Sequence, residues 1–308
     1  MQILFWKQPR VLTPMQPRHL PIAAIITIPV MCFLTVTAAS RDDAACKEQD
    51  AVSDQPVYDQ FSDSGIDNCK WVVVRANWGG IKDGEDYNGG VVPEKVSLRN
   101  KTLVLAARGN LYRGSVVGVD SSGHPRQNGQ RSGAALMSRY RYLGGRFDAR
   151  IKIIHHPGVV SAMWTFFYDQ LPGGTVRNHE IDIEFPGNAN ADAPPSLDHV
   201  TLTSWTGLNP GESTPAYRAL PGSMADGKFH RLTFEWTPPA GGDPGSVVFY
   251  IDDRQLAVIR TNVPSEPANL WLGTWFPQDW AGKPDFDQAE MLVEWVGITP
   301  FAKTISKN

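Results

Sequence analysis

A short acidic stretch near the middle of the chain, Glu180-Ile181-Asp182-Ile183-Glu184-Phe185, constrains the fold more than any other feature. Acidic and apolar residues alternate strictly, and a period of two is typical of a β-strand with one buried face. The other face then carries three carboxylates in a row. Neighbouring carboxylates repel each other, so this row adds nothing to the stability of a fold. It does suit a site in which one carboxyl is a nucleophile and another donates a proton.

The spacing of the acids allows the geometry of such a site to be estimated. The Cα atoms of Glu180 and Glu184 lie about 13 Å apart along a strand, at about 3.3 Å per residue. Two glutamate side chains that lean toward each other span part of this distance, and more of it on a concave sheet. The remaining gap is close to the ~5–5.5 Å between the carboxyls of retaining glycosidases, and shorter than the ~6.5–9.5 Å of inverting ones. Asp182 lies between them, within reach of the nucleophile. The alternative is a solvated acidic strand face.

The stretch and its surroundings resemble glycoside hydrolase family 16, which includes lichenases, laminarinases, agarases, carrageenases and xyloglucan transglycosylases. The acidic motif followed by Pro186-Gly187 is similar to the active-site strand of that family. Further similarities lie in order at 145–152, 228–237, 249–253, 269–271 and 279–280. The resemblance implies an all-β fold, an antiparallel β-jelly-roll sandwich with a substrate cleft on the concave sheet. It also implies that Glu180 is the nucleophile, Asp182 its assistant and Glu184 the general acid/base.

From this resemblance we expect a secreted, retaining endo-β-glucanase that hydrolyses β-1,3/1,4-linked glucan by double displacement. A glucan transglycosylase has the same chemistry, except that a sugar instead of water takes up the glycosyl group. A galactan hydrolase acting on agar or carrageenan is a further alternative, although the five-residue span of the acids resembles lichenases and transglycosylases. The alternative outside enzymes is a carbohydrate-binding jelly roll. Binding relatives of that kind have lost the catalytic glutamates, which this chain keeps.

The first residues of the chain have a different character from the rest. Basic residues precede an apolar run at 20–36, and small residues follow at 37–40. This order predicts a secretory signal peptide over residues 1–39. An uncleaved membrane anchor is the alternative, but two prolines interrupt the run, and it is shorter than the ~20 residues of a spanning helix. We therefore expect a secreted, periplasmic or cell-surface protein that contacts a membrane only if this segment is uncleaved.

The remaining chain is expected to hold a polar linker at 40–53 and one catalytic domain at 54–303. The net charge of −3 gives no basic excess for binding nucleic acid. The family resemblance implies a polysaccharide as the partner, and we expect a monomeric protein. The content of 28 Gly and 24 Pro favours many short strands with tight turns. Cys46 and Cys69 either form one disulfide, as in many exported proteins, or stay as two free thiols.

Other strands are predicted from apolar and alternating runs. We expect strands at 71–75, 103–107, 159–167, 200–205 and 291–298, a strand that follows a turn at 88–90 and continues through Val96, and one that starts at Tyr140 and Tyr142 and runs into Arg150. The strand at 159–167 is expected beside the catalytic strand. The polar composition of 121–133 predicts a loop, and hairpin turns are expected at 241–245 and 252–253.

Several tryptophans are candidates for substrate binding, because glucan rings present flat C–H faces that stack on aromatic side chains. The resemblance places Trp164, Trp205, Trp271, Trp275 and Trp280 on segments near the cleft. Core packing is the alternative for each of them taken singly. Trp271 is the expected main platform.

Further candidate contacts come from polar residues. Asn77 and Trp78 lie in a loop that approaches the cleft in the family, although a loop asparagine is often satisfied by its own backbone. His179 directly precedes the nucleophile, where lichenases and transglycosylases usually have Asp; the other histidines show no metal spacing. No cofactor is required and no catalytic metal is expected. Many family members bind a structural calcium ion, and Glu294 falls near one of its ligands, although acids there are often only surface residues.

Overall fold

The computed structural model describes residues 46, 48–76, 81–82, 85–86, 88–114, 118–119, 125–126, 131–171, 176–187, 198–220, 222–224, 226–277 and 280–301. The chain divides into two units, Met1–Phe33 and Leu34–Asn308, and every described residue belongs to the second. The predicted signal peptide and half of the predicted linker lie outside the described residues. Within the described part, no helix has the length and hydropathy of a membrane span.

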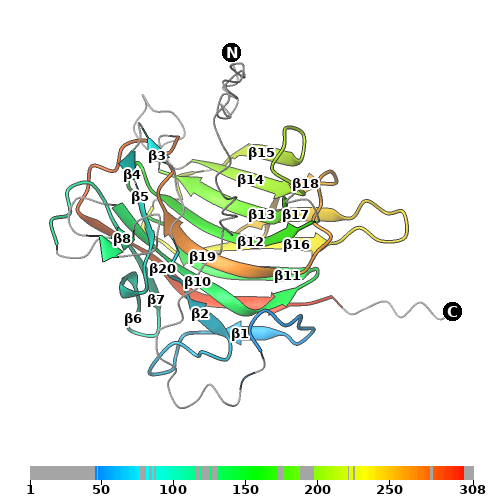
Figure 1. The fold of residues 1–308 in the computed structure, drawn as a ribbon, viewed down its shortest axis with the longest axis horizontal. Helices are drawn as coiled ribbons and strands as arrows, with labels where there is room; N and C mark the ends of the chain where they lie inside the picture. Colours follow the sequence, from blue (N-terminus) through cyan, green and yellow to red (C-terminus); the bar gives the residue numbers. More distant parts are fainter. Residues whose placement is uncertain are drawn as a thin grey trace, which may run out of the picture. The chain divides into compact units, whose positions relative to one another are not determined.

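The described residues form two layers of antiparallel strands (Figure 1). The hydrogen-bonded order is β15-β14-β13-β12-β19-β10-β7-β20-β11-β16-β17-β18. The layers divide between β10 and β7, which meet only at Ser132 and Arg108. The expected all-β jelly-roll sandwich is therefore confirmed.

The element bounds follow the predicted alternation in most places. The strands of the first layer are β2 (Trp71–Val73), β10 (Arg131–Tyr142), β12 (Val160–Gln170), β13 (Val176–Pro186), β14 (His199–Trp205), β15 (Ser213–Ala219) and β19 (Ala268–Trp275). Those of the second layer are β1 (Val57–Asp59), β6 (Val96–Leu98), β7 (Leu103–Arg108), β11 (Gly145–Lys152), β16 (His230–Thr237), β17 (Ser246–Ile251), β18 (Arg254–Ile259) and β20 (Gln288–Thr299). The short elements are β3 (Ile81–Lys82), β4 (Glu85–Asp86), β5 (Asn88–Val91), β8 (Gly118–Val119), β9 (Pro125–Arg126) and the 3-10 helix η2 (Pro93–Lys95).

The core lies between the layers and takes one face of each strand. Ile181 and Ile183 of β13 are fully buried there together with Phe147 of β11 and Phe234 of β16. The rings of Phe147 and Phe234 stack with their centroids 4.8 Å apart. Burying a side chain of this kind contributes about 1.5–3 kcal/mol relative to leaving it exposed. The core therefore fixes which face of β13 is turned outward.

Three local predictions were wrong, and two of them have an identifiable reason. The strand expected through Val96 is interrupted at Pro93, which has no backbone N–H for a sheet and begins η2. Tyr142 ends β10 instead of starting a strand toward Arg150, because the chain reverses at Gly144, whose φ is +78°. The loop expected at 121–133 contains β9 and the first residues of β10. The predicted hairpin at 252–253 is confirmed, with both aspartates at positive φ.

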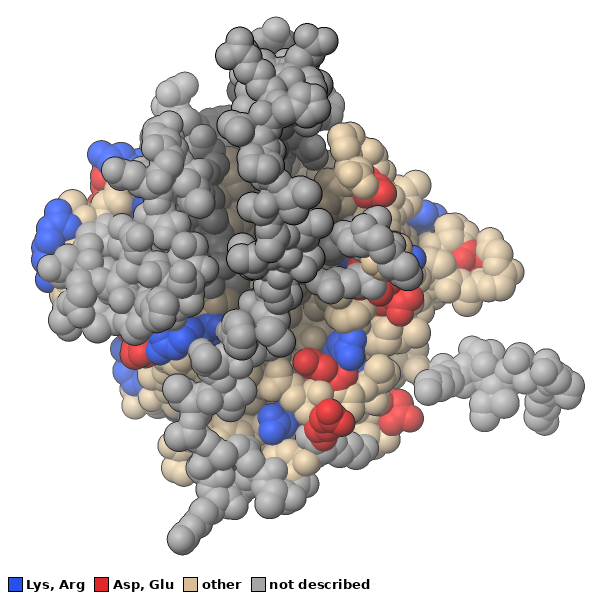
Figure 2. Space-filling view, viewed as in Figure 1, with Lys and Arg blue, Asp and Glu red and all other residues tan. Residues whose placement is uncertain are grey.

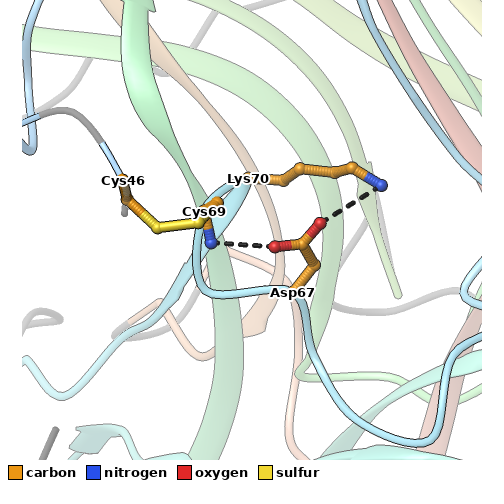
Figure 3. The surroundings of a disulfide bond; sticks show 4 residues. All are labelled: Cys46, Asp67, Cys69 and Lys70. Carbon is orange, nitrogen blue, oxygen red and sulfur yellow. Dashed lines mark hydrogen bonds and ion pairs between the residues drawn. A yellow bond between two sulfur atoms is a disulfide. The ribbon is translucent and has the colours of Figure 1, made fainter. Parts of the chain in front are cut away.

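A disulfide joins Cys46 to Cys69 (Figure 3), which decides between the two alternatives left open by the sequence. The turn before β2 that carries Cys69 is held by Asp67, whose carboxylate accepts a hydrogen bond from the Cys69 backbone N–H at 2.9 Å and lies 3.4 Å from the ammonium group of Lys70. Closing a loop with a sequence separation of 23 stabilises a fold by about 3 kcal/mol in the chain-entropy model.

Charged side chains are mixed on the described part of the surface shown in Figure 2. Acidic and basic residues lie interspersed there, without an extended area of one sign. This distribution agrees with the small net charge of −3. It gives no support for an electrostatic partner such as nucleic acid.

Candidate active site

The three acids of the central motif lie in a row on the outward face of β13. Directly opposed residues of antiparallel strands share a face, and Glu180, Asp182 and Glu184 oppose Phe166, Trp164 and Ala162 of β12. Every residue of β13 from Val176 to Pro186 pairs with β12 without a shift of register. The regular strand predicted from the sequence is confirmed. Asp182 is buried, whereas the two glutamates keep part of their surface open to solvent.

Hydrogen bonds connect the acids with their neighbours on the same face. The side-chain amide of Asn178 donates to Glu180 Oε2 at 2.6 Å. The indole N–H of Trp205 donates to Asp182 Oδ2 at 2.7 Å, and Asp182 forms a hydrogen bond with Glu180. Glu184 accepts a hydrogen bond from Trp275. Each carboxyl is therefore held by at least one donor.

All three acids bind protons more tightly than ordinary carboxyls. Burial raises the pKa of Glu180 to about 7, while hydrogen bonds from Asn178 and Asp182 act in the opposite direction. Burial, followed by the charge of Glu180, raises the pKa of Glu184 to about 8. Burial and then the charges of both glutamates raise the pKa of Asp182 well above its ordinary value. Because the three carboxyls interact, they lose their protons as a group, and the row retains protons at neutral pH.

A partly protonated row of carboxyls has a definite chemical capacity. An ionised carboxyl can act as a nucleophile, and a protonated neighbour can act as a proton donor. A protonated Asp182 donates its hydrogen bond to Glu180. The Trp205 N–H donates to Asp182 Oδ2 and helps to hold the Asp182 side chain in place beside Glu180.

Aromatic side chains extend the same face across β12 and β19. Trp164 opposes Trp271, and their rings stack with centroids 5.6 Å apart and planes inclined by 20°. Phe166 meets Trp271 edge to face at 6.2 Å. Gly273 leaves room for this arrangement, because a Cβ atom there would come within 3.1 Å of Trp164 Cη2. The rings form a largely apolar floor beside the acids.

The structure brings three of the predicted substrate-binding residues to this face. Trp164, Trp205 and Trp271 lie on it through the pairing of their strands. Trp280 is 37% exposed and contacts the ring of Trp275 at 5.7 Å. Asn77 and Trp78, also predicted as contacts, lie outside the described residues.

The prediction that His179 contacts the substrate is wrong, because of the position of this residue. It is 1% exposed, and alternation turns it to the side opposite the acids, where its ring stacks with Phe167 at 6.4 Å. Neither ring nitrogen has a hydrogen-bond partner among the described residues, and burial lowers the pKa of the ring. A residue so placed cannot reach a ligand on the carboxylate face. The prediction assumed that the residue next to Glu180 shares its face, whereas successive residues of a strand point to opposite faces.

Glu294, near which a calcium ligand was expected, forms an ion pair with Arg150 of β11. Within the described ranges, no group of three or more His, Cys, Asp or Glu side chains is arranged to hold a metal ion.

The functional position of Asn178 was not predicted from the sequence. The alternation nevertheless indicates this position, because Asn178 lies two residues before Glu180 and therefore shares the face of the acids. Trp275 was predicted to lie near the cleft as a ring that could stack on substrate, but its hydrogen bond to Glu184 depends on tertiary packing that no local pattern shows.

Comparisons with known proteins agree with this geometry. The chain is 30% identical over 159 residues to "Probable xyloglucan endotransglucosylase/hydrolase protein 21" of Arabidopsis thaliana, which covers 49% of this chain and 47% of the relative. It is 24% identical over 227 residues to a beta-glucanase of Acetivibrio thermocellus, which covers 72% and 56%. The chain thus spans about half the length of these curated relatives.

The fold is also similar to that of solved structures. A prokaryotic beta-1,3-1,4-glucanase (lichenase) derived from a mouse hindgut metagenome matches with a TM-score of 0.59 at 19% identity, over 80% of this chain and 99% of that one. The model of the family described as "Glycosyl hydrolases family 16" matches residues 85–297, which include the whole acidic row. Because this match covers more than half of the 308 residues, the chain belongs to glycosyl hydrolase family 16.

Proposed function

We propose that this protein is a secreted, retaining endo-β-glucanase that hydrolyses β-1,3/1,4-linked glucan by double displacement. One observation carries the proposal: Glu180 and Glu184 share one face of an unbroken strand, and burial raises the pKa of both carboxyls toward neutral pH. Their four-residue separation, bridged by two side chains, suits the ~5–5.5 Å carboxyl spacing of retaining enzymes.

In the first step, the Glu180 carboxylate attacks the anomeric carbon while Glu184 gives its proton to the glycosidic oxygen. The bond between the anomeric carbon and that oxygen breaks, and a covalent glycosyl-enzyme remains. In the second step, the Glu184 carboxylate takes a proton from water, whose oxygen attacks the anomeric carbon. Glu180 leaves as a carboxylate. Two inversions return the β configuration.

Asp182 and its partners act through Glu180. The proton that Asp182 shares with Glu180 stabilises the carboxylate before attack and again when it leaves. The hydrogen bond from Trp205 to Asp182, at 2.7 Å, helps to hold the Asp182 side chain in place beside Glu180. Asp182 and Trp205 are therefore positioning residues.

The aromatic floor supports a glycan substrate, because pyranose rings stack on indole faces. A β-glucan is favoured by the similarity to a beta-glucanase and a lichenase. A transglycosylase is a second candidate, favoured by the relative described as a xyloglucan endotransglucosylase/hydrolase. Secretion is supported by the disulfide between Cys46 and Cys69, since such bonds persist in oxidising compartments.

A reducing-sugar assay on lichenan, laminarin, xyloglucan and agarose tests the substrate. We expect oligosaccharides from lichenan or laminarin from the first time points. Release of glucose alone, or activity only on agarose, would contradict the proposal. Transfer of glycosyl units to a labelled oligosaccharide acceptor in preference to water would favour the transglycosylase.

Azide rescue tests the assigned roles, with a substrate that carries a good leaving group. Loss of either glutamate is expected to add at least about 4 kcal/mol to the barrier, or about three decades of rate at ~1.36 kcal/mol per decade. Glu180→Ala should give an α-glycosyl azide, and Glu184→Ala a β-glycosyl azide, because only the second variant still forms the intermediate. Swapped products would reverse the roles. An α-configured first product from the unaltered enzyme would exclude retention.

A further inference from the structure

A hollow lies on the outer face of the second layer, on the other side of the core from the acidic row. Its volume is about 440 Å³, within the range of about 300–1,000 Å³ typical of small-molecule sites. It is lined by Pro56, Val57, Tyr58, Asp148, Arg231, Trp295, Gly297 and Thr299. Asp148 alternates along β11 with the core residues Phe147 and Ala149. The hollow therefore faces away from the core and shares no side chain with the acidic row.

A glycine creates the hollow. Along the outward row of β20, Gly297 stands between Trp295 and Thr299, and it opposes Tyr58 of β1 and Asp148 of β11. A Cβ atom at this position would make ordinary contacts, at 3.7 Å from Tyr58 Cδ2 and 4.0 Å from the Cβ of Asp148. A larger side chain is therefore tolerated by the backbone but occupies the floor of the hollow.

One wall of the hollow is aromatic. The rings of Tyr58 and Trp295 lie 5.9 Å apart, and the guanidinium of Arg231 lies 5.7 Å from the centre of the Trp295 ring. Tyr58 is 56% exposed although it is large and aromatic. Flat, rigid surfaces of this kind stack on the C–H faces of sugar rings and hydrogen-bond to hydroxyl groups at their edges.

The other wall is polar but electrically balanced. The carboxylate of Asp148, 8% exposed, accepts hydrogen bonds from Thr233 Oγ1 at 2.6 Å, Arg146 Nε at 2.9 Å and Arg231 Nε at 3.1 Å. Arg231 also pairs with Asp253 at 3.0 Å. An anion would meet the carboxylate of Asp148 and a cation the guanidinium of Arg231. These pairs favour a neutral ligand with many hydroxyl groups.

We propose that this hollow is a second carbohydrate-binding site, which holds a neutral glycan chain outside the acidic row. Such a site keeps the protein on a polymer between cleavage events. That the bound glycan is the enzyme's own polymeric substrate rests on the function proposed above; the binding itself does not.

Affinity electrophoresis tests the site, in gels that contain mixed-linkage β-glucan, laminarin or xyloglucan. Glu180→Gln serves as the parent, so that the polymer stays intact. Adding Gly297→Val fills the floor and is expected to weaken retardation about fivefold to tenfold, the effect of losing one good aromatic contact. Gly65→Val is the matched control, because Gly65 is outside the lining and has open space around it. Adding Tyr58→Ala should act like Gly297→Val, and melting temperatures confirm that each variant is folded.

The acidic row is monitored separately with a short chromogenic oligosaccharide. Gly297→Val in the active enzyme should leave kcat/KM for this substrate unchanged and slow the hydrolysis of the polymer. Equal retardation with and without Gly297→Val would contradict the proposed site. So would a loss of retardation in Gly65→Val equal to that in Gly297→Val. Stronger retardation by an anionic polysaccharide than by the neutral glucans would contradict the proposal that the ligand is neutral. If no glycan is hydrolysed, the proposed function fails, but the comparison of retardation in the Glu180→Gln background still decides the binding.

Discussion

The hydrogen bond from Asn178 to Glu180 should set the acid limb of the enzyme's pH profile. The Asn178 amide lies 2.6 Å from Glu180 Oε2, and this contact lowers the pKa of a carboxyl that burial raises to about 7. Asn178→Ala removes the donor. The side-chain oxygen of Asn178 has no partner among the described residues. The substitution therefore removes a hydrogen bond from Glu180 alone, and the variant is expected to fold.

The size of the effect follows from the strength of a hydrogen bond to a charged group, about 1.5–3 kcal/mol. One pKa unit corresponds to about 1.36 kcal/mol, so the acid limb of kcat/KM should move upward by about one pH unit or somewhat more. The direction of the shift follows from the proposed mechanism, in which Glu180 reacts as a carboxylate, because Glu180 in the variant holds its proton to a higher pH. At pH values below both acid limbs, a limb that lies one pH unit higher should lower the rate about tenfold. Because the pKa of Glu184 is about 8, this shift brings the acid limb close to the alkaline limb, so the bell should become narrower and its maximum lower.

The assay is kcat/KM measured from about pH 4 to 10 with a chromogenic oligosaccharide, a range that spans both limbs. Asn269→Ala is a matched control, because Asn269 is also buried but donates to Asp50 and to the carbonyl of Ser138 instead of to Glu180. An acid limb that stays fixed or moves downward in Asn178→Ala would refute the reasoning. An equal upward movement in Asn269→Ala would assign the change to a general perturbation of the fold.

Three further predictions concern stability and binding. The pKa of Glu184 is about 8 in the fold against an ordinary value of 4.5, so its favourable contribution to folding stability is complete below pH 4.5 and is lost as the pH rises to 8. The melting temperature of Glu184→Gln should therefore rise relative to that of the parent over this range, and a constant difference would contradict this prediction. Replacing both Cys46 and Cys69 by Ser should lower the melting temperature by about 6–12 °C, from about 3 kcal/mol at about 2–4 °C each, and reductant should no longer affect it. Trp271→Ala should raise KM for oligosaccharides about tenfold, a loss of about 1.4 kcal/mol, with little change in kcat, and an unchanged KM would remove Trp271 as a platform.

The sequence alone predicted the parts of the site that depend on local periodicity. The face shared by Glu180, Asp182 and Glu184 follows from alternation within one strand, since each residue's direction is set by its neighbours. The same rule, applied to His179, would have placed this histidine in the core. The strand break at Pro93 was likewise readable from the missing N–H of proline.

Contacts between strands that are distant in the sequence could not be predicted from local sequence patterns. Trp205 lies beside the acids because it opposes Glu180 across β13 and β14, and its hydrogen bond to Asp182 depends on that register. The disulfide depends on a separation of 5.2 Å between the Cα atoms of Cys46 and Cys69, which follows from the path of the chain before β2. Register and chain path are set by packing of the whole sandwich, and therefore remained open in the sequence.

The unbroken register of β12 and β13 limits how such a site can change by mutation. Substitutions can alter one side chain at a time, but a one-residue insertion or deletion between Glu180 and Glu184 reverses the facing of every later residue in the strand. Glu184 would then point into the apolar core and Phe185 toward solvent. Only a β-bulge that absorbs the added residue would restore the pattern. Descendants of this chain are therefore expected to vary by substitution within the row, and to gain or lose residues in it only together with a bulge.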